Sequence, residues 1–312
     1  MPRLLLLQFL VIFALVPAAR AEGDQAIWKQ HFAESADGTR IAYYVAGTLT
    51  DGTTPLLVIS GGPGSDHRYM RVGRAFAQLS RKRPVVMFDQ RGTSRSGDVS
   101  EDPQFSRWAE DVDAVRKALN APKVDVLGHS FGGFVAMSYA GEYPERVRSI
   151  TFVDSPSPKL SENEQLLSDI YPDRIGQWRE TRRSLSPQFP ASELSAFFSM
   201  EFVDPEKASA YLQSVSDYVY RIDVNNALRQ QLSTLDFQPI LKGLELPVLI
   251  VHGRFDAVIA PSVAWKVHKL IRGSRIVFIE KAGHLPFVER PDAFVQAVGT
   301  FLDEVDGRTP SR

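Results

Sequence analysis

The chain has 312 residues, of which 44% are hydrophobic and 23% are charged, and its formal net charge is −1. This is the composition of a globular protein, and the near-zero charge lacks the basic excess that nucleic-acid binding requires, so no nucleic-acid partner is expected. The sequence contains no cysteine, which excludes disulfides, thiolate catalysis and thiolate metal ligands.

Residues 1–21 have the pattern of a secretory signal peptide. Arg3 supplies a positive start, an apolar run follows over Leu4–Val16, and Ala21 ends a small-x-small cleavage pattern. An uncleaved anchor is the alternative, but this apolar run is short of the ~20 residues that span a bilayer. We expect cleavage after Ala21 and a periplasmic or secreted mature protein without a stable membrane anchor.

Short apolar runs then alternate with longer helical patterns. The predicted strands are Ile41–Ala46, Leu56–Ser60, Val85–Asp89, Val124–Leu127, Ile150–Val153, Val248–Val251 and Ile276–Ile279. The predicted helices are Met70–Ser80, Phe105–Leu119, Phe131–Glu142, Pro261–Ile271 and Pro291–Val305. Because nearly continuous apolar strands alternate with helices, the pattern predicts an α/β fold with a mostly parallel, doubly wound sheet.

Residues 155–241 interrupt this alternation. The stretch is rich in proline and has helical patterns containing Phe, Tyr and Leu, but it has no convincing strand. We interpret it as a helical cap that is inserted between two parts of one core, residues 22–154 and residues 242–312.

The candidate nucleophile is Ser130. It lies in the run Gly128-His129-Ser130-Phe131-Gly132, a G-x-S-x-G pattern between a predicted strand and a predicted helix. A sharp turn from strand to helix lets the hydroxyl project from the sheet, and the two glycines remove side chains that would collide there. His129 is expected to point away from the serine and to be structural.

A serine nucleophile needs an imidazole within hydrogen-bonding reach, and the sequence offers six histidines. After a turn of this kind the acid and then the histidine follow the serine along the chain, which excludes the three histidines before Ser130. His268 lies within a predicted helix, and His252 closes a predicted strand. His284, on the loop after the last predicted strand, is the expected general base.

Asp256 is the preferred candidate for the acid that accepts the imidazole N–H. It follows the predicted strand Val248–Val251, at the same edge of the sheet as His284. Asp154, at the end of the predicted strand Ile150–Val153, is the alternative.

Acyl transfer places negative charge on a carbonyl oxygen and therefore requires preorganised hydrogen-bond donors. We expect one donor of this oxyanion hole to be the backbone N–H of Phe131, directly after the serine. The other is expected at Gly62, in the glycine-rich loop Ser60–Gly64 that follows a predicted strand.

Five motifs follow one another along the chain. They are Gly61-Gly62-Pro63-Gly64, Asp89-Gln90-Arg91-Gly92 with Arg95-Ser96, Gly128–Gly133, Gly253-Arg254-x-Asp256 and Gly283-His284. Together they resemble the proline iminopeptidase branch of the α/β-hydrolases over residues 41–153 and 248–305. The resemblance implies the α/β-hydrolase fold and hydrolysis through an acyl-enzyme. The sequence departs from that branch at Ser60, where a histidine is usual, and at Ser94, where a glycine is usual.

The predicted function is hydrolysis of an ester or amide bond in a small molecule or short peptide, with no metal or organic cofactor. An aminopeptidase like the proline iminopeptidases is one interpretation, although residues 155–241 lack the Trp-Glu motif with which those enzymes bind a free amine. Glu201, Asp204 and Glu206 are the acidic candidates in that stretch. The alternatives are a carboxylesterase or lactonase, or a ligand-binding protein with a vestigial triad. The sequence predicts no oligomeric state.

Overall fold

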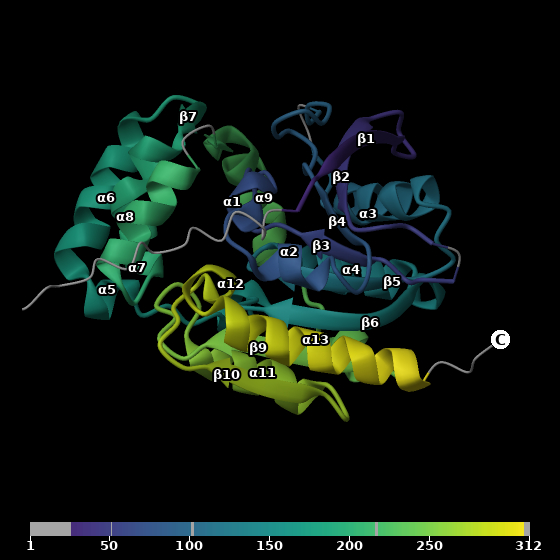
Figure 1. Cartoon of the computed structure of the whole chain (residues 1–312). Helices are drawn as coiled ribbons and strands as arrows, with labels where there is room; N and C mark the ends of the chain where they lie inside the picture. Colours follow the sequence, from purple (N-terminus) through teal and green to yellow (C-terminus); the bar gives the residue numbers. More distant parts are fainter. Residues whose placement is uncertain (1–25, 51, 101–102, 216–217, 309–312) are drawn as a thin grey trace, which may run out of the picture.

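The computed structural model describes residues 26–50, 52–100, 103–215 and 218–308. The predicted signal peptide, residues 1–21, lies outside the described residues. The centre of the fold is an eight-stranded sheet with the order β1-β2-β4-β3-β5-β6-β9-β10 (Figure 1). Its strands are β1 (Lys29–Glu34), β2 (Arg40–Ala46), β3 (Leu56–Ile59), β4 (Val85–Phe88), β5 (Val124–His129), β6 (Val147–Val153), β9 (Val248–Gly253) and β10 (Arg275–Ile279).

The sheet is parallel from β4 to β10. β1 and β2 form an antiparallel hairpin, and β2 also pairs antiparallel with β4, whereas the other five pairs are parallel. Every residue of β3, β4, β5 and β9 is buried, as expected for parallel strands with both faces covered by helices. The prediction of a mostly parallel, doubly wound α/β fold is confirmed.

Helices pack against the sheet in two groups. Helix α13 (Pro291–Arg308) packs beside α2 (Ala75–Leu79), and α3 (Ser106–Ala118) packs beside α4 (Gly132–Glu142) (Figure 1). Helix α11 (Pro261–Leu270) packs on β9 and β10. Because the strands from β4 to β10 are parallel, the loops that follow their carboxyl ends meet at one edge of the sheet, where α/β proteins place their sites.

The chain between β6 and β9, residues 154–247, departs from the strand–helix alternation, and we refer to it as the insert. Its elements are α5 (Leu167–Ile170), α6 (Pro172–Ser184), β7 (Gln188–Pro190), α7 (Ser195–Glu201), α8 (Pro205–Ser214), β8 (Val219–Arg221), α9 (Ile222–Thr234) and α10 (Gln238–Lys242). Several backbone hydrogen bonds tie it to loops at the carboxyl edge of the sheet, and two of them reach the loops of the site. The N–H of Arg221 donates to the carbonyl of Gly64, and the N–H of His284 donates to the carbonyl of Glu201.

Three details of the predicted secondary structure were wrong. The single helix expected at Met70–Ser80 is two short helices, α1 (Arg68–Arg71) and α2, because Gly73 adopts a φ of 87° between them. Strand β1 was missed because it is an edge strand with mostly exposed residues and no apolar run. The insert also contains a short antiparallel pair, β7 and β8, whose three-residue strands are too short to give a pattern.

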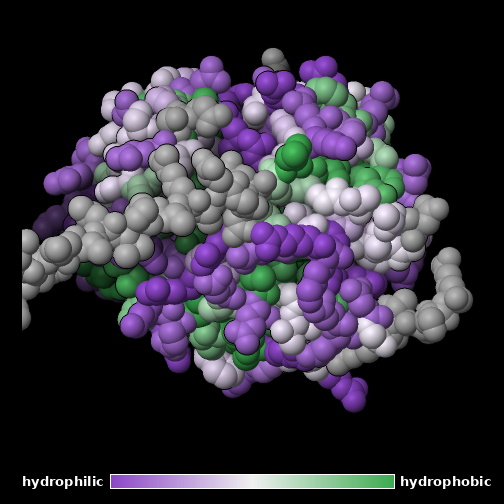
Figure 2. Space-filling model, in the orientation of Figure 1, coloured by the Kyte–Doolittle hydropathy of each residue, from purple (hydrophilic) through white to green (hydrophobic). Residues whose placement is uncertain are grey.

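The surface of the described residues is mixed in character. In Figure 2 the coloured part of the visible face is mainly hydrophilic, with hydrophobic residues in small patches. Among large apolar side chains, Phe32, Phe255 and Trp265 are exposed, as single residues commonly are on protein surfaces. No helix within the described ranges is both long enough and apolar enough to cross a membrane.

Candidate active site

Ser130 occupies a sharp turn between β5 and α4. Its φ is 52°, in the left-handed region, which takes the chain from strand to helix within one residue. A Cβ at Gly128 would collide with the carbonyl of Gly132, and a Cβ at Gly132 would collide with the carbonyl of Ile59. The close approach of backbone segments therefore requires both glycines of the G-x-S-x-G pattern.

Asp256 and His284 follow the neighbouring parallel strands β9 and β10. The Nδ1 atom of His284 lies 2.8 Å from Oδ2 of Asp256, and both side chains are buried. The other carboxylate oxygen of Asp256 accepts the backbone N–H groups of Val258 and Ile259 at 2.8 and 3.0 Å. Asp256 is thus held by its own loop and bonded to the imidazole.

This pair has the protonation that a general base requires. Burial alone raises the pKa of Asp256, but the charge and hydrogen bond of His284 outweigh burial and leave that pKa lowered. Burial alone lowers the pKa of His284, but Asp256 outweighs burial and leaves that pKa raised. Asp256 is therefore a carboxylate at neutral pH, so Nδ1 of a neutral His284 carries the hydrogen and Nε2 is the acceptor.

Ser130 and His284 line the same cavity, which has a volume of about 650 Å³. Among the described residues, the Ser130 hydroxyl has no hydrogen-bond partner, and the side-chain hydrogen bond of His284 is the one to Asp256. Bonds between nucleophile and base are often long without substrate and shorten when it binds. The structure thus brings the predicted serine and histidine to one cavity and joins the histidine to the predicted acid.

The alternative acid, Asp154, lies beside this pair in a different protonation state. It follows β6, and its Oδ1 accepts the backbone N–H of Gly253 at 2.7 Å. Burial and then the charge of Asp256 raise the pKa of Asp154 well above its usual range. Burial and the neighbouring carboxylate therefore both favour the neutral form of Asp154.

The expected oxyanion donors are the backbone N–H groups of Phe131 and Gly62. Both residues line the cavity, and neither N–H donates to another described residue. The N–H of the neighbouring Gly61 is already engaged, since it donates to the Tyr69 hydroxyl at 2.6 Å. Phe131 is also the N-cap of α4, where the helix dipole favours negative charge.

A buried chain of hydrogen bonds joins the glycine loop to the histidine loop. The Tyr69 hydroxyl, which accepts from Gly61, lies 2.5 Å from Nδ1 of His129. On the other side of the ring, Nε2 of His129 lies 2.8 Å from the carbonyl oxygen of His284. A carbonyl only accepts, so Nε2 carries the hydrogen. Burial lowers the pKa of His129 to about 3, so the ring is neutral and Nδ1 accepts from Tyr69.

His129 was expected to be structural, and its contacts agree with that expectation. Sequence reasoning missed Tyr69, because its partner His129 is 60 residues away and no local motif links the two. The signal available in the sequence was a histidine directly before the predicted nucleophile, just after a predicted apolar strand.

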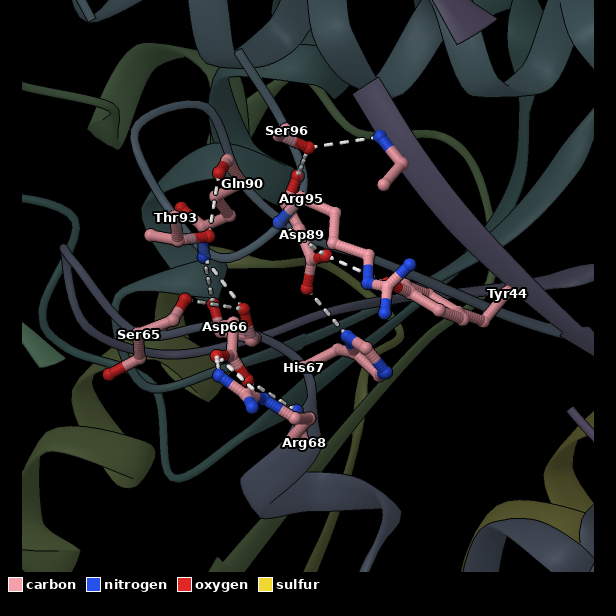
Figure 3. Close-up of polar contacts among 12 residues, drawn as sticks. Tyr44, Ser65, Asp66, His67, Arg68, Asp89, Gln90, Thr93, Arg95 and Ser96 are labelled. Atoms are coloured by element: carbon pink, nitrogen blue, oxygen red, sulfur yellow. Dashed lines mark hydrogen bonds and ion pairs between the residues drawn. The ribbon is translucent and has the colours of Figure 1, made fainter. Parts of the chain in front are cut away.

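A second polar network supports the glycine loop (Figure 3). The side-chain nitrogen of Gln90 donates to the carbonyls of Ser60 and Gly61, at 2.7 and 3.1 Å. Asp89 lies 2.7 Å from Nδ1 of His67, and both side chains are buried. The Asp-Gln-Arg-Gly motif therefore positions the loop that carries Gly62.

Among the residues that the structure describes, two buried clusters have the residue types of metal sites, namely Asp66-His67-Asp89 and Asp154-His252-Asp256. In the first, Asp66 forms an ion pair with Arg68 at 2.6 Å. In the second, Asp256 accepts hydrogen bonds from His284 and from two backbone N–H groups. Because these carboxylates already have protein donors, we assign both clusters to hydrogen bonding.

Glu201, at the end of α7, lines the cavity with a buried carboxyl group. Burial raises the pKa of Glu201 to about 8, and its Oε2 has no partner among the described residues. Of the other acidic candidates, Asp204 caps α8 by accepting the backbone N–H of Lys207, and Glu206 is exposed. Burial thus distinguishes Glu201, and the sequence alone could not show that burial.

Known proteins similar in sequence are hydrolases. A proline iminopeptidase from Heyndrickxia coagulans is 29% identical over 273 residues, which are 81% of this chain and 92% of that protein. A pimeloyl-[acyl-carrier protein] methyl ester esterase from Neisseria meningitidis serogroup A is 29% identical over 205 residues, which are 64% of each chain.

Solved structures and family profiles give the same fold. The esterase RhEst1 from Rhodococcus sp. ECU1013 matches with a TM-score of 0.72 and 26% identity, covering 88% of this chain and 99% of that one. The sequence profile of the alpha/beta hydrolase fold matches residues 54–291, which include the turn at Ser130 and both partner loops. This chain belongs to the α/β-hydrolase family.

Proposed function

We propose that this chain is a serine hydrolase that cleaves an ester or amide bond of a small substrate through an acyl-enzyme. Ser130 is the nucleophile, His284 the general base and Asp256 the acid that orients the base. The observation that carries the proposal is the buried 2.8 Å bond between His284 and Asp256, beside the cavity that Ser130 also lines. No metal or organic cofactor takes part in the proposed reaction.

In the proposed reaction, Nε2 of His284 takes the hydroxyl proton as the oxygen of Ser130 attacks the substrate carbonyl carbon. The carbonyl oxygen becomes negatively charged and accepts the N–H groups of Phe131 and Gly62. His284 then gives the proton to the leaving alcohol or amine, which departs and leaves an ester on Ser130. Water attacks this ester with the same imidazole as base, and release of the acid restores the serine.

The insert is proposed to act as the cap, predicted at residues 155–241, that supplies the specificity pocket. It contributes Trp178, Phe197 and Tyr220 to the lining of the cavity. Aromatic walls with a few polar groups are typical of sites for small ligands.

Glu201 favours an aminopeptidase over the other hydrolases. Its backbone carbonyl accepts the N–H of His284 at 2.8 Å, so the residue that bears the buried carboxyl is bonded to the base. An ammonium group would compensate the burial of this carboxylate. In a peptide, the N-terminal amine is two bonds from the carbonyl carbon that a serine attacks. A carboxylate this near the base therefore suits removal of an N-terminal residue, the activity named for the Heyndrickxia relative.

A carboxylesterase is the second candidate. The esterase RhEst1 covers nearly the same length at 26% identity, and the cavity lining is rich in apolar side chains. An ester substrate needs no partner for an amine, and Glu201 would then remain a neutral acid below pH 8.

A fluorophosphonate probe tests the hydrolase proposal. We expect one equivalent of adduct on Ser130 and none on the Ser130→Ala variant; folded wild-type protein that forms no adduct would contradict the proposal. A ligand-binding protein with a vestigial triad would instead bind ligand saturably, with equal and negligible hydrolysis in both proteins.

Two substrates separate the candidate activities, prolyl 4-nitroanilide and 4-nitrophenyl acetate. For an aminopeptidase, Glu201→Gln should lower kcat/KM for the anilide by about tenfold or more, since a charge-assisted bond is lost, and should change the acetate reaction much less. For an esterase, the acetate should be the better substrate and the variant should affect both reactions alike.

We also propose that the protein is exported to the periplasm or secreted, with residues 1–21 removed. N-terminal sequencing of the protein from its natural host should give Glu22 as the first residue. An intact N-terminus in the cytosolic fraction would contradict this proposal.

A further inference from the structure

Three arginines of the insert line the cavity, namely Arg179 and Arg182 on α6 and Arg229 on α9. Within the described ranges, none of them forms an ion pair with a carboxylate. Arg179 donates to the hydroxyl of Ser168, and Arg182 donates to amide oxygens of the α9 side chains. The cavity therefore has three guanidinium groups whose charges are not neutralised by these neighbours.

Two other arginines on the same segments of the insert are paired. Arg183, next to Arg182 on α6, forms an ion pair with Glu180 at 2.6 Å. Arg221, just before α9, forms an ion pair with Asp223 at 2.7 Å. Arg174 on α6 also lacks a carboxylate partner among the described residues, but it does not line the cavity. What distinguishes Arg179, Arg182 and Arg229 is therefore that these unpaired guanidinium groups line one cavity.

Arg182 is close to the glycine loop. Its guanidinium donates to the side-chain oxygen of Asn225 at 3.0 Å, and the side-chain nitrogen of Asn225 lies 3.4 Å from the carbonyl oxygen of Pro63. Two hydrogen bonds therefore connect this cation to the loop that carries Gly62. One small substrate could therefore contact Arg182 at one end and place its reacting carbonyl beside the glycine loop.

Charges of opposite sign lie at two places around the cavity. Glu201 is the acidic residue among the described residues that line it, and the arginines lie on α6 and α9. Tyr220 also lines the cavity: besides burial, which raises its pKa to about 12, the charges of Arg182, Glu201 and Arg229 act on it. The cavity therefore suits a small molecule with a cation at one end and an anion at the other.

A guanidinium presents parallel N–H donors that match the two oxygens of a carboxylate. Three such cations around one cavity repel one another, and binding of an anion would offset this repulsion. Arg179 and Arg229 are exposed, so the arginines can be reached from the solvent side of the insert.

We propose that Arg179, Arg182 and Arg229 bind the free carboxylate of a short peptide whose N-terminal amine is held by Glu201. The proposal rests on the aminopeptidase function proposed above and names its substrate class as short, uncapped peptides such as dipeptides. The carboxylate belongs to the leaving part of the substrate, so the arginines recognise the peptide by its length.

Calorimetric binding to Ser130→Ala protein tests the site without turnover. Prolyl-glycine should bind at least about tenfold more tightly than prolyl-glycinamide, which lacks only the carboxylate charge. This preference should fall to less than about twofold when Arg182→Gln and Arg229→Gln are added. Arg229→Gln alone, at an exposed position, should reduce the preference and leave thermal unfolding unchanged.

The matched control is Arg174→Gln in the same background. Arg174 is an exposed arginine on α6 that does not line the cavity, so the preference for prolyl-glycine should be retained. Equal affinity for the two peptides, or an equal loss of preference in the Arg174 variant, would overturn the anion site.

Labelling of wild-type Ser130 distinguishes failure of this inference from failure of the proposed function. If the serine is labelled and 4-nitrophenyl acetate is hydrolysed, but neither peptide binds, the hydrolase proposal stands and the anion site is wrong. If the carboxylate preference is found but no adduct forms on Ser130, the site stands and the hydrolase proposal is wrong.

Discussion

The Nε2 atom of His129 lies 2.8 Å from the backbone carbonyl oxygen of His284. The residue before the proposed nucleophile thus holds the loop of the proposed base by its main chain. Through Tyr69, the same ring is linked to the glycine loop. A buried chain of neutral groups therefore links the loop of the base directly to the loop of the oxyanion donors, and the first prediction follows from it.

Tyr69→Phe should lower kcat by about tenfold or more with little change in KM. The substitution removes the acceptor of the Gly61 N–H and the donor to His129. The glycine loop and the loop of His284 are then held less firmly relative to each other, which misplaces the reacting groups. The free energy of unfolding should also fall by about 1–3 kcal/mol, because buried polar groups lose their partners. Steady-state kinetics and urea unfolding measure the two effects.

Tyr139→Phe is the control for this prediction. Its hydroxyl is buried and bonds to Asp113 at 3.4 Å, far along α4 from the serine. This variant should change stability and leave kcat within about twofold. Equal losses of kcat in both variants would show that Tyr69 has no positioning role.

Asp256→Asn and Asp154→Asn should differ strongly in activity. The first replaces a charged acceptor of the His284 N–H by an amide that favours the wrong tautomer, and kcat should fall by about 10⁴-fold. The second replaces a carboxyl group whose raised pKa favours the neutral form, so a neutral amide preserves that charge and kcat should fall by less than about tenfold. Parallel activity measurements near pH 7.5 check both; the opposite order would assign the acid to Asp154.

Glu201→Gln should change how stability depends on pH. The carboxyl has a pKa of about 8 in the folded protein and an ordinary value of 4.5, so between these values the folded state keeps a proton that the unfolded state has lost. Stability from this group is therefore present below about pH 4.5 and is lost as pH rises to 8, by at most about 1.4 kcal/mol per pH unit.

Urea unfolding of wild type and variant at pH 5, 6.5 and 8 measures this loss. The glutamine variant should lose less stability than wild type across the series, because its side chain does not ionise. Glu206→Gln, at an exposed position, should follow the wild-type curve. Parallel curves for wild type and Glu201→Gln would show that the carboxyl titrates near its ordinary value.

Gly132→Ala should destabilise the turn at Ser130. The added methyl group would collide with the carbonyl groups of Ile59 and Ser60, which belong to the neighbouring strand and loop and cannot move independently. We expect a loss of about 1–3 kcal/mol in unfolding free energy and a large loss of activity.

Gly176→Ala is the matched substitution in a helix of the insert. A Cβ there would meet no atom within 4 Å, and alanine favours helix by about 0.8–1 kcal/mol over glycine. This variant should therefore be as stable as wild type or more stable, with unchanged activity. Thermal unfolding of both variants provides the comparison.

Patterns within short segments predicted the order of the core and the turn at Ser130. An apolar strand, two glycines at fixed spacing and an apolar helix are local features of the sequence. In the structure Gly128 is required by a local contact with Gly132, whereas Gly132 is required by the carbonyl of Ile59 on another strand. Prediction was weaker where the local signal is short, as in the three-residue strands β7 and β8. The helix expected at Met70–Ser80 was broken because Gly73 adopts a left-handed conformation that the apolar period does not reveal.

The sequence by itself determined the α/β-hydrolase fold and the candidate residues Ser130, Asp256 and His284, because their chemistry is tied to turns and strand ends that are read locally. Tertiary structure alone decided which carboxyl group bonds to His284, which acidic residue of the insert is buried, and which arginines lack a carboxylate. Protonation and charge depend on burial and on partners that are distant along the chain. Those quantities exist only once the insert is folded over the edge of the sheet.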